Sequence, residues 1–273
     1  PQFSTRAAGT TIVATNKYAY GANLGWMDWR GDTNNGAVIG EYVCSGYIYA
    51  ANVGWINLGS GSPANGIQYQ NNSATDFGVN QDGTGKLSGY AYGANIGWIN
   101  FEQTYGQPKV DLYTGKLSGS IWSANCGWIS LSNSFADVQT VTIQPGALAP
   151  NGLLIAWLLQ NFGTTNVNAN ADPDLDGQTT AQEYAAGTDP NLGSSVFKIT
   201  TFTRDIPTPT YTKLVWNAVG TRFYTVQQRS SLNDGTWTDY LSYSFPGWTA
   251  VGFNDFNPTN DFFRVRAYRP LMP

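Results

Sequence analysis

A nine-residue phrase that occurs four times in the first half of the chain most constrains the fold of this sequence. Each copy ends in Asn, an apolar residue, Gly and Trp, and the asparagines are separated by 29, 43 and 30 residues. The four copies are residues 18–26, 47–55, 90–98 and 120–128. A period near thirty residues is typical of repeat architectures, in which each copy forms one structural unit. The first half of the chain therefore predicts a domain of four similar units.

The residues between the turn signals predict that these units are built from strands. Asp-Gly, Thr-Gly and Gly-Ala-Asn sequences supply turn chemistry, and runs of four to seven aromatic and β-branched residues lie between them. The fullest copies indicate about three short antiparallel strands each. We therefore expect a mainly β fold that begins with a repeat domain over residues 1–143.

The repeated Trp residues have two interpretations. Because Ile or Met follows each Trp in a chain with few charges, we expect the indoles to be buried clamps between units. In the alternative, the repeated aromatic residues form an exposed face that stacks on sugar rings. The candidate ligand-binding residues of that alternative are Tyr47, Tyr49, Tyr90 and Tyr92.

Composition limits the classes of protein that the chain can represent. Charged residues make up 12% and aromatic residues 14% of the 273 residues, and the formal net charge is −4. A nucleic-acid-binding protein needs a basic surface, which this balance excludes, and no apolar run is long enough to span a membrane. The profile favours a secreted, extracellular or cell-surface β protein. Since the sequence begins at Pro1, we expect a mature chain or a chosen boundary, with a pairing strand in the first fifteen residues.

The two cysteines occupy apolar positions of the repeat. Cys44 aligns with Leu87 and Leu117, whereas Cys126 follows the motif Asn. An oxidising compartment would permit a disulfide between them. Two buried free thiols that pack as small apolar groups are the other interpretation.

Residues 144–192 differ in composition and predict a helix followed by a metal-binding loop. The helix is expected over 147–162, where an apolar run surrounds Trp157. The sequence from Asp172 to Glu183 follows the spacing of an EF-hand calcium loop, D-x-D-x-D-G-x5-E. The expected calcium ligands are Asp172, Asp174, Asp176, the backbone carbonyl of Gln178, and Glu183. Asp189 is either a further ligand or a turn residue.

Residues 150–190 resemble a known calcium segment of secreted bacterial surface proteins. The resemblance rests on Trp157–Gly163, on Asn170–Gly177, and on the sequence Glu183–Pro190. This segment is similar to thrombospondin type-3 and dockerin repeats, which implies bound calcium. Residues 193–273 alternate strand-like runs with turn clusters and look like a fibronectin- or immunoglobulin-like β-sandwich.

The residues argue against an enzyme. The chain has no His, which excludes the usual Ser-His-Asp and Cys-His mechanisms and the common zinc sites. The carboxylates outside the acidic loop are scattered through turns, so we do not expect paired-carboxylate glycoside hydrolysis.

Three functional hypotheses follow from these features. The first is an extracellular structural protein, stiffened by calcium, that assembles with copies of itself into a filament through an N-terminal segment or the apolar helix. The second is a carbohydrate-binding or adhesive surface module that uses the aromatic repeat face and binds polysaccharide. The weakest is a non-catalytic appendage of a larger enzyme.

Overall fold

The protein is mainly β and divides into two compact units. The computed structural model describes residues 9–205, 210–233, 236–242, 247, 249–255 and 262–271. One unit contains the chain up to Val167 together with Leu271, and the other contains Asn168–Pro270. The boundary falls inside the segment 144–192. The predicted helix therefore belongs to the first unit and the acidic loop to the second. Residues 1–8 of the expected N-terminal strand lie outside the described residues.

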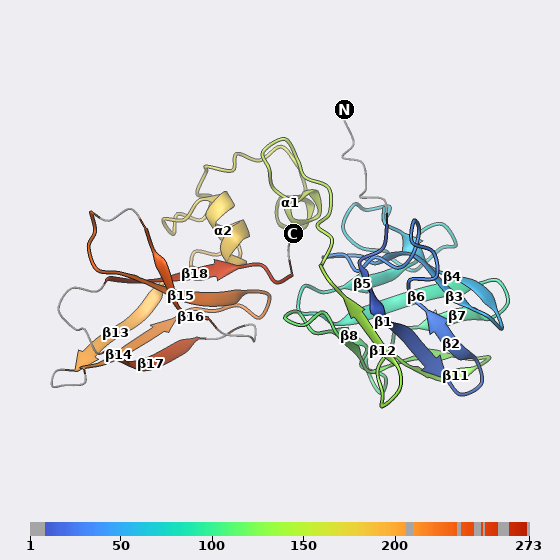
Figure 1. The fold of residues 1–273 in the computed structure, drawn as a ribbon. Helices are drawn as coiled ribbons and strands as arrows, with labels where there is room; N and C mark the ends of the chain where they lie inside the picture. The colour runs from blue at the N-terminus through green and yellow to red at the C-terminus, as the bar shows by residue number, and fades with distance from the viewer. Residues whose placement is uncertain are drawn as a thin grey trace. The chain divides into compact units, whose positions relative to one another are not determined.

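The first unit is built around a closed barrel of eight antiparallel strands (Figure 1). Neighbouring strands are hydrogen-bonded in chain order, and the last strand pairs with the first, where Tyr20 faces Ser130. The barrel strands are β1 (Ile12–Gly21), β2 (Gly25–Asp28), β3 (Ser45–Ala50), β4 (Gly54–Ser60), β6 (Leu87–Gly93), β7 (Gly97–Asn100), β10 (Ser120–Ser123) and β11 (Gly127–Ser130).

Each copy of the repeated phrase forms one β-hairpin of the barrel. The hairpins are β1–β2, β3–β4, β6–β7 and β10–β11, and we number them first to fourth. The turn holds three residues, and the motif Gly follows it with φ between 76° and 83° in all four copies. A three-residue hairpin loop requires a left-handed residue at this position, which explains the Gly. Each copy contributes two barrel strands, and the predicted third strand lies outside this ring.

Two layers of apolar side chains fill the barrel. The residue after each motif Trp points inward, and so does the residue two positions further on, because side chains alternate along a strand. These eight residues are at most 1% exposed. They are Met27, Trp29, Ile56, Leu58, Ile99, Phe101, Ile129 and Leu131.

Short strands outside the eight-stranded ring complete the hairpins. β5 (Val79–Gln81) pairs with β6, and β8 (Lys109–Val110) pairs with β9 (Leu117–Ser118). The first hairpin takes its extra strand from the other end of the repeat domain, because β12 (Asp137–Thr140) pairs with β1. Ile12 lies opposite Thr140 in this pairing. β12 therefore lies beside the first hairpin, outside the closed ring, although it comes from the other end of the repeat domain.

The helix of the first unit is shorter than the sequence predicts. α1 spans Ile155–Phe162, whereas residues 147–154 form turns closed by a bridge between Leu148 and Leu154. Pro150 and Gly152, whose φ is +81°, account for the late start of the helix. Trp157 and Leu158 are buried.

The second unit contains α2 (Thr180–Ala186) and two three-stranded antiparallel sheets. The first sheet has the order β13 (Ile199–Asp205), β14 (Thr210–Trp216), β17 (Ala250–Asp255). The second has the order β16 (Thr238–Ser242), β15 (Phe223–Arg229), β18 (Phe262–Tyr268). Leu214 and Trp216 from the first sheet share one buried cluster with Tyr224 and Val226 from the second.

The two cysteines are free, so the interpretation as a disulfide is wrong for this structure. Cys44 is buried in the apolar slot that the repeat predicts, and burial raises the pKa of its thiol to about 12. Cys126 is only partly buried because it lies in the turn of the fourth hairpin.

This difference predicts selective thiol chemistry. In the native protein, dithionitrobenzoate should react with Cys126 and leave Cys44 unmodified, because the reactive species is the thiolate. The absorbance of the released thiolate counts the modified cysteines, and C126S should remove the reaction. Rapid modification of Cys44 in native C126S would contradict the prediction.

Candidate functional site: acidic loop and aromatic belt

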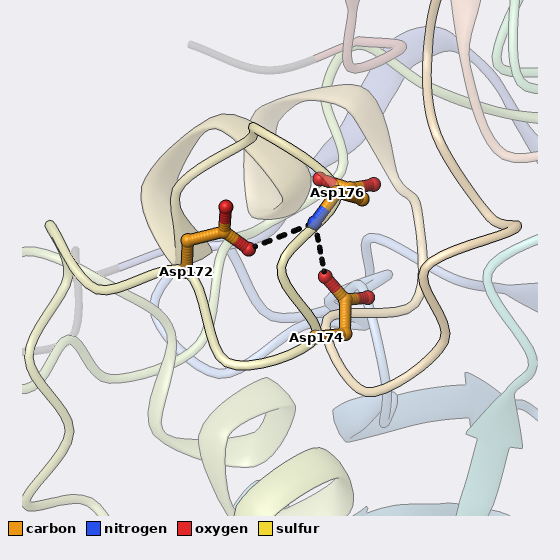
Figure 2. A group of neighbouring side chains, drawn as sticks. All are labelled: Asp172, Asp174 and Asp176. Carbon is orange, nitrogen blue, oxygen red and sulfur yellow. Dashed lines mark hydrogen bonds between the residues drawn. The ribbon is translucent and has the colours of Figure 1, made fainter.

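The sequence-predicted loop brings three carboxylates together. One oxygen from each of Asp172, Asp174 and Asp176 lies within 4.8 Å of the other two. The backbone holds them in place, since the N–H of Asp176 donates to Asp172 Oδ1 at 3.2 Å and to Asp174 Oδ1 at 3.3 Å (Figure 2). The N–H of Gly177 donates to Asp172 Oδ2 at 2.9 Å. This group could hold a metal ion.

The helix after the loop adds a fourth carboxylate. Thr179 starts α2 with a capping box, and Glu183 lies one turn into the helix with 0% of its surface exposed. Four buried oxygens in this region have no hydrogen-bond partner among the described residues: Asp174 Oδ2, Asp176 Oδ2, Glu183 Oε1 and Glu183 Oε2. Buried anionic oxygens without donors are costly unless a cation compensates them. An all-oxygen, acidic donor set suits a hard cation such as Ca²⁺.

The electrostatics of Glu183 agree with this picture. Burial, reinforced by the charges of Asp174, Asp176, Asp172 and Asp189, raises the pKa of Glu183 from 4.5 to about 7. In the metal-free fold, protonation of Glu183 is therefore stabilising. This contribution is complete below pH 4.5 and is lost as the pH rises through 7.

Cation binding needs the ionised carboxylate, so it should show the opposite dependence on pH. We expect the Kd for calcium to be about tenfold higher at pH 6 than at pH 8, because the proton competes for Glu183. Calcium titrations at both pH values measure the ratio. E183Q should bind more weakly and lose most of the dependence. A wild-type Kd that stays constant from pH 6 to 8 would contradict the prediction.

Hydrogen bonds hold the acidic loop and α2 against the rest of the second unit. The side-chain amide of Gln178 donates to the carbonyl oxygen of Phe197 at 2.7 Å, so the ligand expected from this residue is its backbone carbonyl. Arg222, next to β15, donates to the carbonyl oxygens of Tyr184 at 2.7 Å and Ala185 at 2.9 Å. These bonds fix the C-terminal end of α2. Asp189 accepts from the N–H of Asn191 at 3.0 Å, as a turn residue does.

The second candidate site lies on the outer surface of the barrel. Ten repeated aromatic side chains are each 38–47% exposed, and we call them the aromatic belt. They are Tyr18, Trp26, Tyr47, Tyr49, Trp55, Tyr90, Tyr92, Trp98, Trp122 and Trp128. The expectation that the motif Trp residues are buried clamps is therefore wrong. The period-two alternation places each of them outward, next to an inward-facing Ile or Met.

The aromatic side chains contact one another across each hairpin. Tyr49 and Trp55 have ring centroids 4.9 Å apart, Tyr92 and Trp98 have the same separation, and Trp122 and Trp128 are 5.2 Å apart. Such cross-strand pairs contribute roughly 0.5–1.5 kcal/mol to a hairpin. The contacts orient the rings and still leave a large part of each ring accessible to a ligand.

The motif Asn has a role that the sequence did not reveal. Asn52 Nδ2 donates to the carbonyl oxygen of Leu24 at 2.9 Å, in the turn of the preceding hairpin. The same bond recurs around the barrel: Asn95 to Val53 at 3.0 Å, Asn125 to Ile96 at 2.9 Å and Asn23 to Cys126 at 3.2 Å. The four amides therefore link the four turns in a closed circle. Sequence reasoning assigned the Asn only to its own turn.

No helix in the described part of the chain has the length and apolar character needed to cross a membrane. Comparison of the chain with protein-family models, with curated proteins and with solved structures finds no match.

Proposed function

We propose that this is an extracellular or cell-surface protein whose barrel binds carbohydrate through the aromatic belt and whose C-terminal unit is stabilised by calcium. One observation carries the proposal. All four hairpins present Trp to solvent, and the belt occupies the outer face of the barrel strands.

The belt is not needed to fill the barrel. Other residues form the two interior layers, and the motif Asn and Gly build the turns and the circle of amides. Exposed clusters of aromatic residues on a soluble protein usually mark a binding surface. Repetition on all four hairpins favours a ligand with repeating units over a single protein interface, which would need only one side of the barrel.

The chemistry of the belt suits sugars. A Tyr or Trp ring offers an apolar face to the C–H groups of a pyranose, and the phenol and indole N–H groups hydrogen-bond to hydroxyls. Two charged side chains lie beside Tyr18 of the belt, Lys17 over its ring and Asp28 opposite it, and they pair with each other at 2.7 Å. Neutral polysaccharide is accordingly the ligand class that we propose.

The acidic loop supplies the calcium site of this proposal. Asp172, Asp174, Asp176 and Glu183 would provide carboxylate oxygens, and Gln178 its backbone carbonyl. The likeness of residues 150–190 to calcium segments of secreted bacterial surface proteins supports both the ion and the extracellular location. We propose that the two sheets that follow form a fibronectin- or immunoglobulin-like sandwich.

Retention on insoluble polysaccharide tests the proposal. The full chain with calcium should sediment with at least one of cellulose, chitin or an insoluble α-glucan. The double variant W98A/W128A should lose most of this retention, because stacking aromatic residues dominate such contacts. V141A, at an exposed apolar position outside the belt, is the control. If wild type and the double variant stay equally in solution with every polysaccharide, carbohydrate binding is wrong.

A second candidate function is a calcium-stiffened subunit of an extracellular filament. The observation in its favour is β13, which pairs only with β14 among the described residues and exposes Ile199 and Phe202. An unprotected edge strand can accept a strand from another copy. Electron micrographs of the pure protein with calcium would show fibres if this function holds. A particle that stays monomeric at high concentration would contradict it.

A further inference from the structure

We infer that the principal carbohydrate site lies at the seam between the third and fourth hairpins, is centred on Asn100, and takes a short neutral oligosaccharide. The inference rests on the proposed function and assigns it to one place in the belt. It follows from the strand register, which joins neighbouring hairpins into continuous rows of outward-facing residues.

Each row runs across four strands and begins on one hairpin and ends on the next. At the third seam, Asn100 on β7 faces Tyr90 on β6 and Trp122 on β10, and Trp122 in turn faces Trp128 on β11. Each of the other three seams has a similar row of four residues, and the second residue of each row is polar. Their rows are Tyr18–Asp28–Tyr49–Trp55, Tyr47–Asn57–Tyr92–Trp98 and Ser120–Ser130–Tyr20–Trp26.

The four seams differ in the hydrogen bonds that the polar residue in the second position of the row makes within the protein. Both carboxylate oxygens of Asp28 are occupied, by Lys17 Nζ at 2.7 Å and by the N–H of Arg30 at 2.8 Å. Asn57 Oδ1 accepts from the N–H of Gly59 at 2.8 Å, and Ser130 Oγ donates to the carbonyl oxygen of Ser132 at 2.9 Å.

Asn100 differs from these three residues. It is half-buried in the row, and its side-chain amide makes no hydrogen bond to any residue that the structure describes. A carboxamide carries two donors and one acceptor oxygen, which matches the hydroxyl groups of a sugar. Asn100 is therefore the central group with its full hydrogen-bonding capacity left for a ligand.

The aromatic residues of this seam differ in kind from those of the others. Two Trp rings lie beside each other in the row, at 5.2 Å, where the first two seams place a Tyr next to a Trp. The loop 102–107 borders Trp128: a Cβ on Gly106 would lie 3.0 Å from that indole. The Glu102 carboxylate fixes this loop by accepting from the N–H groups of Thr104 and Tyr105 at 2.8 and 3.1 Å.

The dimensions of the row indicate the size of the ligand. Four adjacent strands give the row a path of about 14 Å along the curved outer surface of the barrel, since neighbouring strands are about 4.8 Å from one another. This length suits several linked pyranose rings rather than a monosaccharide. The row carries no formal charge, so an acidic sugar gains no ion pair here.

Calorimetric titration of the full chain with calcium tests the inference, with cellohexaose, chitohexaose, maltohexaose and mannohexaose as probes. At least one probe should bind, and N100A should raise its Kd about tenfold, the effect of one or two lost hydrogen bonds. W122A should raise it about 30-fold. N57A, the matched change at the second seam, should alter it less than twofold. N100Q, which retains an amide, should recover part of the affinity, and thermal melts confirm that each variant is folded.

The outcomes separate this inference from the function on which it rests. Equal losses in N100A and N57A, or no loss in N100A, would overturn the assignment to the third seam and leave carbohydrate binding intact. If no probe binds and the insoluble polysaccharides also fail to retain the protein, both the function and the seam are wrong. Self-association that W122A abolishes would instead make the row a contact between copies, which also overturns the inference.

Discussion

Chelation of calcium should unfold the C-terminal unit well below the temperature at which the barrel unfolds. Glu183, Asp174 and Asp176 bury oxygens that have no partner among the described residues, and a bound cation would compensate them. Calcium at about a thousand times its Kd contributes about 4 kcal/mol to the folded state, which corresponds to about 15 °C or more for a unit of roughly 100 residues. Differential scanning calorimetry with calcium and with chelator measures the shift.

The location of the acidic loop decides which unit loses thermal stability when calcium is removed. The sequence places the acidic loop in a separate segment, residues 144–192, between the two β regions, but the loop and α2 belong to the unit Asn168–Pro270. Arg222 also fixes α2 to the region before β15. We therefore expect the chelator to lower the unfolding temperature of the C-terminal unit and to leave the unfolding temperature of the barrel unchanged.

Two variants control the calcium experiment. E183Q should reproduce the low-temperature transition even when calcium is present. D189N removes a charge that acts on Glu183 but no oxygen of the three-aspartate group, so it should weaken calcium binding slightly and keep most of the thermal shift. Equal shifts of both transitions, or no shift in chelator, would contradict the prediction.

Gly115→Ala should destabilise the barrel by about 3–5 kcal/mol and lower its Tm by about 10 °C. Gly115 has a φ of +76°, and a Cβ there would lie 1.9 Å from the carbonyl oxygen of Thr140. That carbonyl belongs to β12, so the added methyl group would push away the strand that pairs with β1. Urea denaturation followed by tryptophan fluorescence measures the loss.

Gly152→Ala is a matched control for this change. Gly152 has a φ of +81°, but nothing lies within 4 Å of a Cβ at this position. Gly152→Ala should therefore cost only the strain of an L-residue in the left-handed backbone conformation, about 1–2 kcal/mol. If both variants lose the same stability, the contact with Thr140 is not important and the pairing of β12 with β1 contributes less to the barrel than the structure indicates.

Local patterns in the sequence predicted much of the fold. The turn chemistry of the repeated phrase predicted four β units, and the spacing of Asp172, Asp174 and Asp176 predicted their grouping. Glu183, the last residue of the predicted motif, lies in α2 outside that group of three. The helix around Trp157 was also predicted, although Pro150 and Gly152 delay its start to Ile155.

Other features depend on long-range geometry that a single sequence does not contain. Whether Trp98 faces the core or the solvent depends on which side of the strand Ile99 takes, and a Trp-Ile pair fits either register. Ring closure between β1 and β11, and the bonds from each motif Asn to the preceding turn, join residues up to 110 positions apart. The unit boundary after Val167 likewise depends on tertiary packing rather than on composition.

The pairing of β11 with β1 has a consequence for synthesis. Hairpins form from neighbouring residues within microseconds, so each copy can fold as it leaves the ribosome. The ring itself must wait, because Tyr20 meets Ser130 only after the fourth hairpin has been made. Until then the nascent sheet has two open edges, and a ribosome that stalls before residue 130 would release a chain prone to join the sheets of its neighbours.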